Sequence, residues 1–172
     1  VSPHLLILVD EDIPGDEGFW KMNPPLRGLA DRQALIDGLL DGTIDCIATD
    51  HAPHGLEEKQ QSFLNAPFGI VGSETAFQLI YTNFVETGIF TLEQVIDWMA
   101  VKPAEIFGLN AGTLTIGAPA DIAVFDLATA APIDAEAFES MAVNTPFTGW
   151  TVKGKTLMTF VDGALAWSEE AQ

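Results

Sequence analysis

Apolar and polar positions alternate in two different ways along the 172-residue chain. Up to about residue 109, short apolar runs are separated by stretches whose apolar residues recur at helical spacing. That alternation is typical of βα units around a parallel sheet. Thr91 followed by Gln94 has the spacing of a capping box, which marks the start of a helix. We predict strands at 5–9 and 44–48, an acidic loop at 10–18, and helices at 31–40, 73–85 and 92–99.

After residue 109 the apolar runs become shorter and are punctuated by glycine and proline. This half is predicted to be rich in β-strands, in part antiparallel, and Asp162-Gly163 has the composition of a tight hairpin turn. We therefore expect one region over 1–109 and a second over 110–172. The predicted strands are 112–116, 121–125, 150–152, 156–161 and 164–167, with a helical insert at 135–141.

The chain is strongly acidic, with 25 Asp and Glu against 7 Lys and Arg and a formal net charge of −18. Such a surface repels phosphate backbones and anionic lipids, so we expect no nucleic-acid partner and no membrane partner. A single cysteine, Cys46, excludes an internal disulfide framework and fits a reducing compartment, which predicts a cytoplasmic location. The chain opens directly into an apolar run without an initiator Met, and we interpret it as a fragment of a longer protein.

The candidate chemistry concentrates at Thr49-Asp50-His51-Ala52-Pro53-His54, directly after the predicted strand 44–48. Catalytic residues of parallel α/β folds stand at the carboxyl ends of strands. A carboxylate there can bind a metal ion or accept a proton from metal-bound water. The alternative is a turn in which Asp50 caps the next helix and both histidines are solvated. The residues alone leave both interpretations open.

Two further loops are stiff enough to present a ligand site. Asn23 lies in Lys21–Arg27 beside two prolines and offers both a donor and an acceptor, while Gly69 follows Pro67-Phe68 and would let main-chain amides approach a ligand. On its own, each of these loops is interpreted as a structural feature: a stiff loop whose Arg27 pairs with an acidic neighbour, and a structural turn at Gly69. The stretch 149–156 matches the letters of a phosphate-binding loop, but a strand pattern follows it in place of a helix. We interpret it as a hairpin turning at Gly154.

In this order, the loops resemble the C-terminal portion of the larger bacterial type of dihydroorotase, a metal-dependent amidohydrolase of pyrimidine synthesis. The combination of Asn23–Arg27 with Thr49–His54 resembles dihydroorotases more than hydantoinases or allantoinases. The resemblance covers essentially the whole chain and rests on residues 1–4, 21–27, 47–54, 66–74, 118–126 and 144–150.

The resemblance implies an α/β fold, in which 1–109 supplies the C-terminal βα units of a (β/α)₈ metal-dependent hydrolase barrel and 110–172 supplies part of a small flanking β-sandwich. Zinc would lie at the carboxyl face of the barrel. Asp50 matches the family's metal ligand and general acid/base, and the substrate would be dihydroorotate or, in reverse, N-carbamoyl-L-aspartate. A homo-oligomer is expected, with aspartate transcarbamoylase as a further candidate partner. Asn23, His54, Phe68 and Gly69 match substrate-binding positions.

The chain lacks the His-x-His pair of the family's metal site, and His4 aligns with a family histidine outside that site. One carboxylate cannot hold zinc against water, so we predict that this chain alone is inactive. Strands at Leu5 and Ile44 would leave edges unpaired, which predicts self-association, association with a missing N-terminal piece, or partial disorder. Two alternatives stay open: a hydantoinase-like or allantoinase-like cyclic amidase, and an inactive scaffold subunit for aspartate transcarbamoylase.

Overall fold

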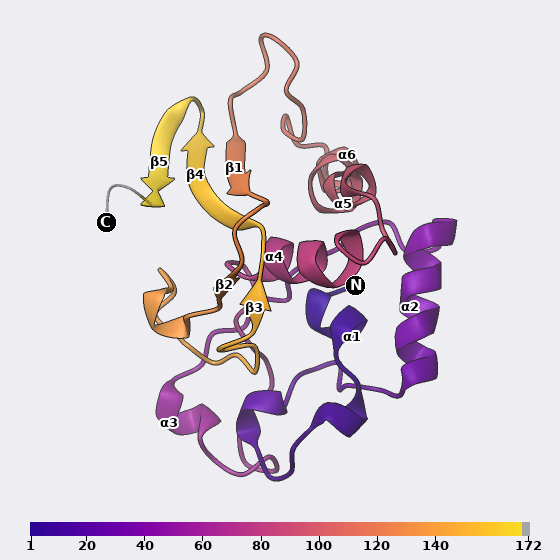
Figure 1. Cartoon of the computed structure of the whole chain (residues 1–172), viewed down its shortest axis with the longest axis vertical. Coiled ribbons are helices and arrows are strands. Elements are labelled where there is room, and N and C mark those ends of the chain that lie inside the picture. The colour runs from indigo at the N-terminus through magenta and orange to yellow at the C-terminus, as the bar shows by residue number, and fades with distance from the viewer. Residues whose placement is uncertain (170–172) are drawn as a thin grey trace. The chain divides into compact units, whose positions relative to one another are not determined.

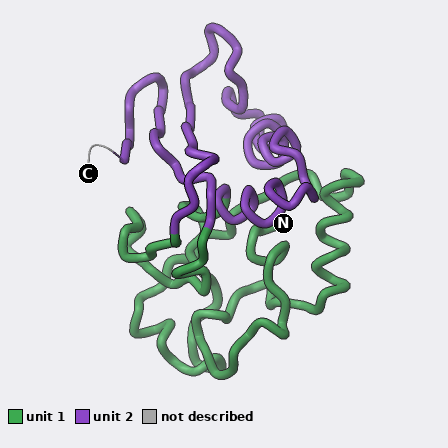
Figure 2. Tube along the Cα trace, in the orientation of Figure 1, with its two compact units in different colours: residues 1–76, 132–151 green, residues 77–131, 152–172 purple. Residues whose placement is uncertain are grey.

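The computed structural model describes residues 1–169 and divides into two compact units (Figure 2). Unit 1 combines residues 1–76 with 132–151, and unit 2 combines 77–131 with the stretch from 152 onward. The predicted division at residue 109 falls inside unit 2 and stays a prediction about the domains of a longer protein. No helix among the described residues is long and apolar enough to cross a membrane.

Unit 1 contains three short α-helices and irregular loops, with Leu6, Leu39, Ile70 and Phe147 almost fully buried in its core. The predicted helix 31–40 is confirmed by α2, which spans Leu29–Asp41. Gly42 caps its C-terminus with a φ of 83°, in the left-handed conformation that glycine adopts readily. The regular elements are α1 (Pro3–Ile7), α2 (Leu29–Asp41), α3 (Leu56–Lys59) and the 3₁₀ turns η1 (Asp10–Asp12), η2 (Gly18–Trp20) and η5 (Ala135–Ala137), as Figure 1 shows for the helices.

The predicted strand 5–9 is wrong, because Pro3 begins helix α1 there. Proline suits the first helical turn, where its missing N–H would have no partner, and an apolar run of five residues does not distinguish strand from helix. Leu5 therefore presents no strand edge. Extended pairing occurs instead at Val1, whose ammonium donates to the Cys46 carbonyl at 3.0 Å and whose carbonyl accepts from Ala48 N at 2.9 Å. That is the pattern of a parallel bridge.

The segment 44–48 does not form the regular strand that we predicted. Ile47 is buried. Among residues 1–169, however, the stretch 44–48 pairs its main chain with one other extended segment, at Val1. A strand is defined by its neighbours, and an apolar run without paired neighbours stays irregular. The self-association that we predict from this edge stays a prediction.

Unit 2 contains most of the helical residues after 76. The predicted helices 73–85 and 92–99 are confirmed, the first beginning at Ala76, and the capping box is present, with Thr91 Oγ1 accepting from Gln94 N at 3.2 Å. Phe84 stacks on Phe90, whose ring meets Trp98 edge-on, and these rings fill the core. The helical segments are α4 (Ala76–Ile80) with the π-helical turn η3 (Tyr81–Val85), then α5 (Leu92–Ile96), the π-helical turn η4 (Asp97–Val101) and α6 (Lys102–Phe107).

Three antiparallel strands form a sheet in the order β1-β4-β5 (Figure 1). The predicted hairpin turn is confirmed, since Asp162 and Gly163 have φ of 49° and 79° between the last two strands. Gly154 lies between strands of different sheets and is followed directly by a strand, so both a phosphate loop and our predicted hairpin at this glycine are excluded. The strands are β1 (Ile122–Asp126), β4 (Lys155–Val161) and β5 (Ala164–Ser168), with β2 (Ala131–Pro132) paired to β3 (Thr151–Val152).

Two other predicted elements are wrong. Residues 112–116 form no strand, and Leu114 and Ile116 are 80% and 102% exposed, so the apolar residues there have nothing to pair with. The helical insert 135–141 is reduced to the single 3₁₀ turn η5.

Candidate active site

Asp50 is an exposed residue in left-handed backbone conformation, with φ of 52°. No hydrogen bond to its carboxylate is made by residues 1–169, so the oxygens are available to a ligand. Aspartate is one of the few residues that tolerate this conformation. Helix α3 is preceded by Gly55, so Asp50 does not cap it, and the alternative of a simple capping turn is excluded.

His4 is buried near Asp50 and hydrogen-bonded to Ser2, with 3.0 Å between Nε2 and the Ser2 Oγ. Burial lowers the pKa of His4 to about 4, and the negative charge of Asp50 opposes that shift. His4 is therefore neutral at physiological pH and occupied by a hydrogen bond inside the fold.

His51 fastens the loop that follows Asp50. Its Nδ1 accepts hydrogen bonds from the main-chain N–H of Gly72 at 3.1 Å and of Ser73 at 3.3 Å, and its backbone forms a parallel bridge with Ile70. The ring must therefore present an unprotonated Nδ1. This histidine orients the loop and is not merely solvated.

His54 connects the Asp50 loop to the Phe68-Gly69 loop. Its Nε2 lies 2.7 Å from the Phe68 carbonyl oxygen, and because a carbonyl only accepts, Nε2 carries the proton. Its backbone N–H donates to Asn144 Oδ1 at 3.1 Å. His54 is thus held at two points, the ring through Nε2 and the main chain through its N–H, and Nδ1 is the ring nitrogen without a partner among the described residues.

Gly69 has φ of 118° and no room for a side chain, since a Cβ would lie 2.4 Å from the Ala52 Cβ. Its N–H donates to the Lys21 carbonyl at 2.9 Å, and its carbonyl accepts from Lys59 Nζ at 2.8 Å and from Asn144 Nδ2 at 3.2 Å. Its polar groups are therefore engaged within the protein. That Gly69 lets main-chain amides approach a ligand stays a prediction, and its own N–H is not one of those amides.

Phe68 and Asn23 are the exposed members of the adjoining loops. The Phe68 side chain is 53% exposed, Lys21 Nζ lies 4.5 Å from the centroid of its ring, and the Phe68 N–H has no main-chain partner among residues 1–169. Asn23 is exposed and precedes Pro24 through a cis peptide bond, two residues after the carbonyl that binds Gly69.

The structure thus ties together the loops of Asn23, His54, Phe68 and Gly69 by hydrogen bonds. Asp50 is connected to these loops only indirectly, through the β-bridge between its neighbour His51 and Ile70. In the part of the chain that the structure describes, its carboxylate makes no hydrogen bond to any of these four residues.

Two buried residues that hold the loops of the candidate site together escape the sequence analysis. Lys59 is fully buried, and Asn144 is 1% exposed; both bind the Gly69 carbonyl. Lys59 follows Glu57 and Glu58 at the start of a short helix, and such a charged run normally faces solvent. The local sequence therefore gives no sign that its side chain is buried. Asn144 lies in a stretch that carries the resemblance, but nothing in its spacing marks the side chain as buried.

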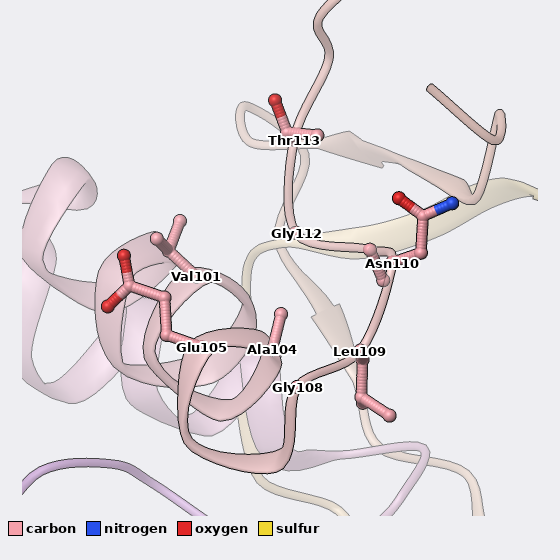
Figure 3. A pocket seen from close by; sticks show the side chains of 9 residues that line it. Val101, Ala104, Glu105, Gly108, Leu109, Asn110, Gly112 and Thr113 are labelled. Carbon is pink, nitrogen blue, oxygen red and sulfur yellow. The ribbon is translucent and has the colours of Figure 1, made fainter. Parts of the chain in front are cut away.

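The donor set of this chain does not fit a zinc ion by itself. No group of three or more His, Cys, Asp or Glu side chains that could hold a metal occurs within residues 1–169. Asp50 could supply one carboxylate ligand only. A hollow in unit 2, seen close by in Figure 3, contains none of the candidate residues, and its one charged side chain is Glu105.

A model of the amidohydrolase family matches residues 26–166. The chain is 99% identical over all 172 residues to a dihydroorotase of Enterococcus faecalis, and 62% identical over 169 residues to a dihydroorotase of Bacillus caldolyticus. It spans about 40% of the length of both relatives.

Solved structures give the same fold. L-hydantoinase (dihydropyrimidinase) from Arthrobacter aurescens superposes with a TM-score of 0.88 and 31% identity over 98% of this chain and 38% of its own. Dihydropyrimidinase from Brevibacillus agri gives a TM-score of 0.89 at 24% identity, over 99% of this chain and 39% of its own. Together with the family match, these likenesses confirm the predicted α/β class and a part of a larger barrel-containing hydrolase, while the flanking β-sandwich stays a prediction. The chain belongs to the amidohydrolase family.

Proposed function

We propose that this chain is the part of a dihydroorotase that carries its general acid/base and part of its substrate site. The reaction is the reversible hydrolysis of dihydroorotate to N-carbamoyl-L-aspartate. The observation that carries the proposal is the 99% identity to a dihydroorotase across the whole chain. The hydantoinase structure reaches 31%, which favours dihydroorotate over a hydantoin ring as the substrate.

Asp50 is proposed as the group that moves the proton. Water attacks the ring amide carbonyl, and the Asp50 carboxylate accepts the proton that the water loses. The bond between the carbonyl carbon and the ring nitrogen then breaks, and Asp50 returns the proton to the departing nitrogen. A carboxylate that is exposed and without hydrogen bonds among the described residues is free for both transfers.

Asn23, His54, Phe68 and Gly69 are proposed to hold the substrate. The Asn23 amide can both donate to and accept from the ring, and His54 offers Nδ1 once Nε2–H is bound to the Phe68 carbonyl. The N–H that the loop can offer to the ring is that of Phe68, since the N–H of Gly69 is bound to Lys21. Gly69 keeps this loop close to His54.

Zinc is proposed as the metal of the full-length enzyme, with Asp50 as the ligand that this chain contributes. The other ligands must come from outside residues 1–169, and the chain alone is therefore predicted to be inactive. A cytoplasmic homo-oligomer is proposed for the full-length enzyme, and aspartate transcarbamoylase remains a candidate partner on the resemblance alone.

The test uses the full-length Enterococcus faecalis dihydroorotase, with Asp50→Asn introduced at the matching position. Asparagine tolerates the left-handed backbone and keeps the shape of the side chain, so the fold should be retained, as circular dichroism would show. Hydrolysis of dihydroorotate should fall about 10²–10⁴-fold, the usual contribution of general acid/base catalysis. Undiminished hydrolysis by the variant would exclude this role of Asp50. Faster turnover of hydantoin than of dihydroorotate by the wild type would favour the hydantoinase alternative, and wild-type protein without either activity would favour the scaffold.

A further inference from the structure

Lys59 is the most deeply buried charged side chain of the described residues, with 0% of its surface exposed. Its Nζ donates to three main-chain carbonyls, those of Gly69 at 2.8 Å, Pro67 at 3.0 Å and Lys21 at 3.1 Å. An ammonium has three donors, so each one is used. No carboxylate pairs with it among residues 1–169.

The three carbonyls belong to the loops that carry the candidate substrate residues. Pro67 and Gly69 lie on either side of Phe68, and Lys21 lies two residues before Asn23. The Lys21 carbonyl also accepts from the Gly69 N–H, so the two loops are closed onto each other at the point that Lys59 binds. One side chain thus fixes the relative position of two ligand-facing loops.

The backbone of Lys59 is itself held in place. A Cβ on Gly18 would lie 2.4 Å from the Lys59 carbonyl oxygen and 2.6 Å from the Ala66 Cβ, so η2 packs directly against the end of α3. A buried ammonium without a counter-ion is costly: burial lowers the pKa of Lys59 to about 8, and the charge of Lys21 adds to this shift. Lys59 therefore contributes by fixing the positions of the three carbonyls that it binds.

We propose that Lys59 is a positioning residue that holds the Phe68-Gly69 loop against the Lys21–Asn23 loop in the arrangement that binds the substrate. This inference rests on the proposed function and extends it to a residue that does not touch the ligand. Lys21 and Lys59 also bring positive charge close to Phe68 in a strongly acidic chain, which suits an anionic substrate such as dihydroorotate.

The test variant is Lys59→Met in the full-length Enterococcus faecalis enzyme, because methionine keeps the length of the side chain and removes the three donors. The Lys21 carbonyl keeps its bond from Gly69 N, and the Gly69 carbonyl keeps Asn144. Pro67 alone loses a partner that the described residues do not replace, so the variant should fold. The control is Lys153→Met, which removes an exposed lysine bound to Glu86 in unit 2.

We expect Lys59→Met to raise the KM for dihydroorotate at least about tenfold while kcat stays within about threefold, because contacts made equally to substrate and transition state change KM. Lys153→Met should leave both constants unchanged. An unaltered KM, or a fall in kcat alone that reflects a smaller folded fraction, would overturn the inference. If Lys59→Met does not fold, Lys59→Arg is measured. The planar guanidinium keeps the charge but cannot direct three donors from one atom to the three carbonyls, so the KM should rise. A KM like that of the wild type would also overturn the inference. Wild-type enzyme without dihydroorotase activity would refute the proposed function instead.

Discussion

Replacing Gly69 by alanine introduces two separate penalties at the centre of the candidate site. The new Cβ would lie 2.4 Å from the Ala52 Cβ, whereas carbon atoms pack at about 3.5–4.0 Å, so one of the two loops must move. The φ of 118° is also a conformation that L-residues rarely adopt. Backbone strain of about 1–3 kcal/mol and overpacking of about 1–3 kcal/mol predict a loss of about 2–6 kcal/mol in the free energy of unfolding.

Two companion variants separate these penalties. Gly42→Ala has a φ of 83° and open space around the new Cβ, so it should lose only the strain, about 1–3 kcal/mol. The double variant Ala52→Gly with Gly69→Ala removes the clash and should recover the overpacking part, about 1–3 kcal/mol. Urea unfolding of the full-length protein, followed by circular dichroism, gives the three values. If Gly69→Ala loses no more stability than Gly42→Ala, or if Ala52→Gly restores nothing, the close approach of the two loops is refuted.

The remaining predictions concern buried polar side chains. The unfolded chain protonates His4 near pH 6.5 and the folded chain only near 4, so stability should be complete above pH 6.5 and fall by up to about 3 kcal/mol on acidification to pH 4. In His4→Gln the urea midpoint should depend less on pH between pH 4 and pH 6.5 than it does in the wild type. An unchanged pH dependence would contradict the assignment to His4. Asn144→Ala removes the partner of the His54 N–H and the donor to the Ala52 and Gly69 carbonyls, and should cost about 1–3 kcal/mol in the same assay. A neutral result would show that water replaces the amide.

Elements that depend on local chemistry could be predicted from the sequence. The capping box at Thr91 and the Asp162-Gly163 turn each involve a few adjacent residues, and both form as expected. The strands predicted at 5–9 and 112–116 failed because a strand requires partners, which an apolar run does not reveal. Pro3 is a signal for a helix start, and helix α1 begins there.

The candidate site likewise contains residues that local sequence identifies and residues that it does not. Asp50, His54 and the Phe68-Gly69 loop could be selected because they belong to short motifs of a recognisable order. Lys59 and Asn144 could not, since their roles arise from carbonyls and amides that come from distant parts of the chain. A buried lysine is defined by what surrounds it, and its neighbours along the sequence gave the appearance of an exposed helix start.

The two buried partners of the Gly69 carbonyl become available at different times during synthesis. Lys59 precedes Gly69 by 10 residues, whereas Asn144 follows it by 75 residues. At 5–20 residues per second, the ribosome needs roughly 4–15 s to reach Asn144. During that interval the nascent loop can be held by the lysine but not by the amide. The second stretch of unit 1, 132–151, completes the hydrogen bonds of the candidate-site loops only after most of unit 2 has been translated.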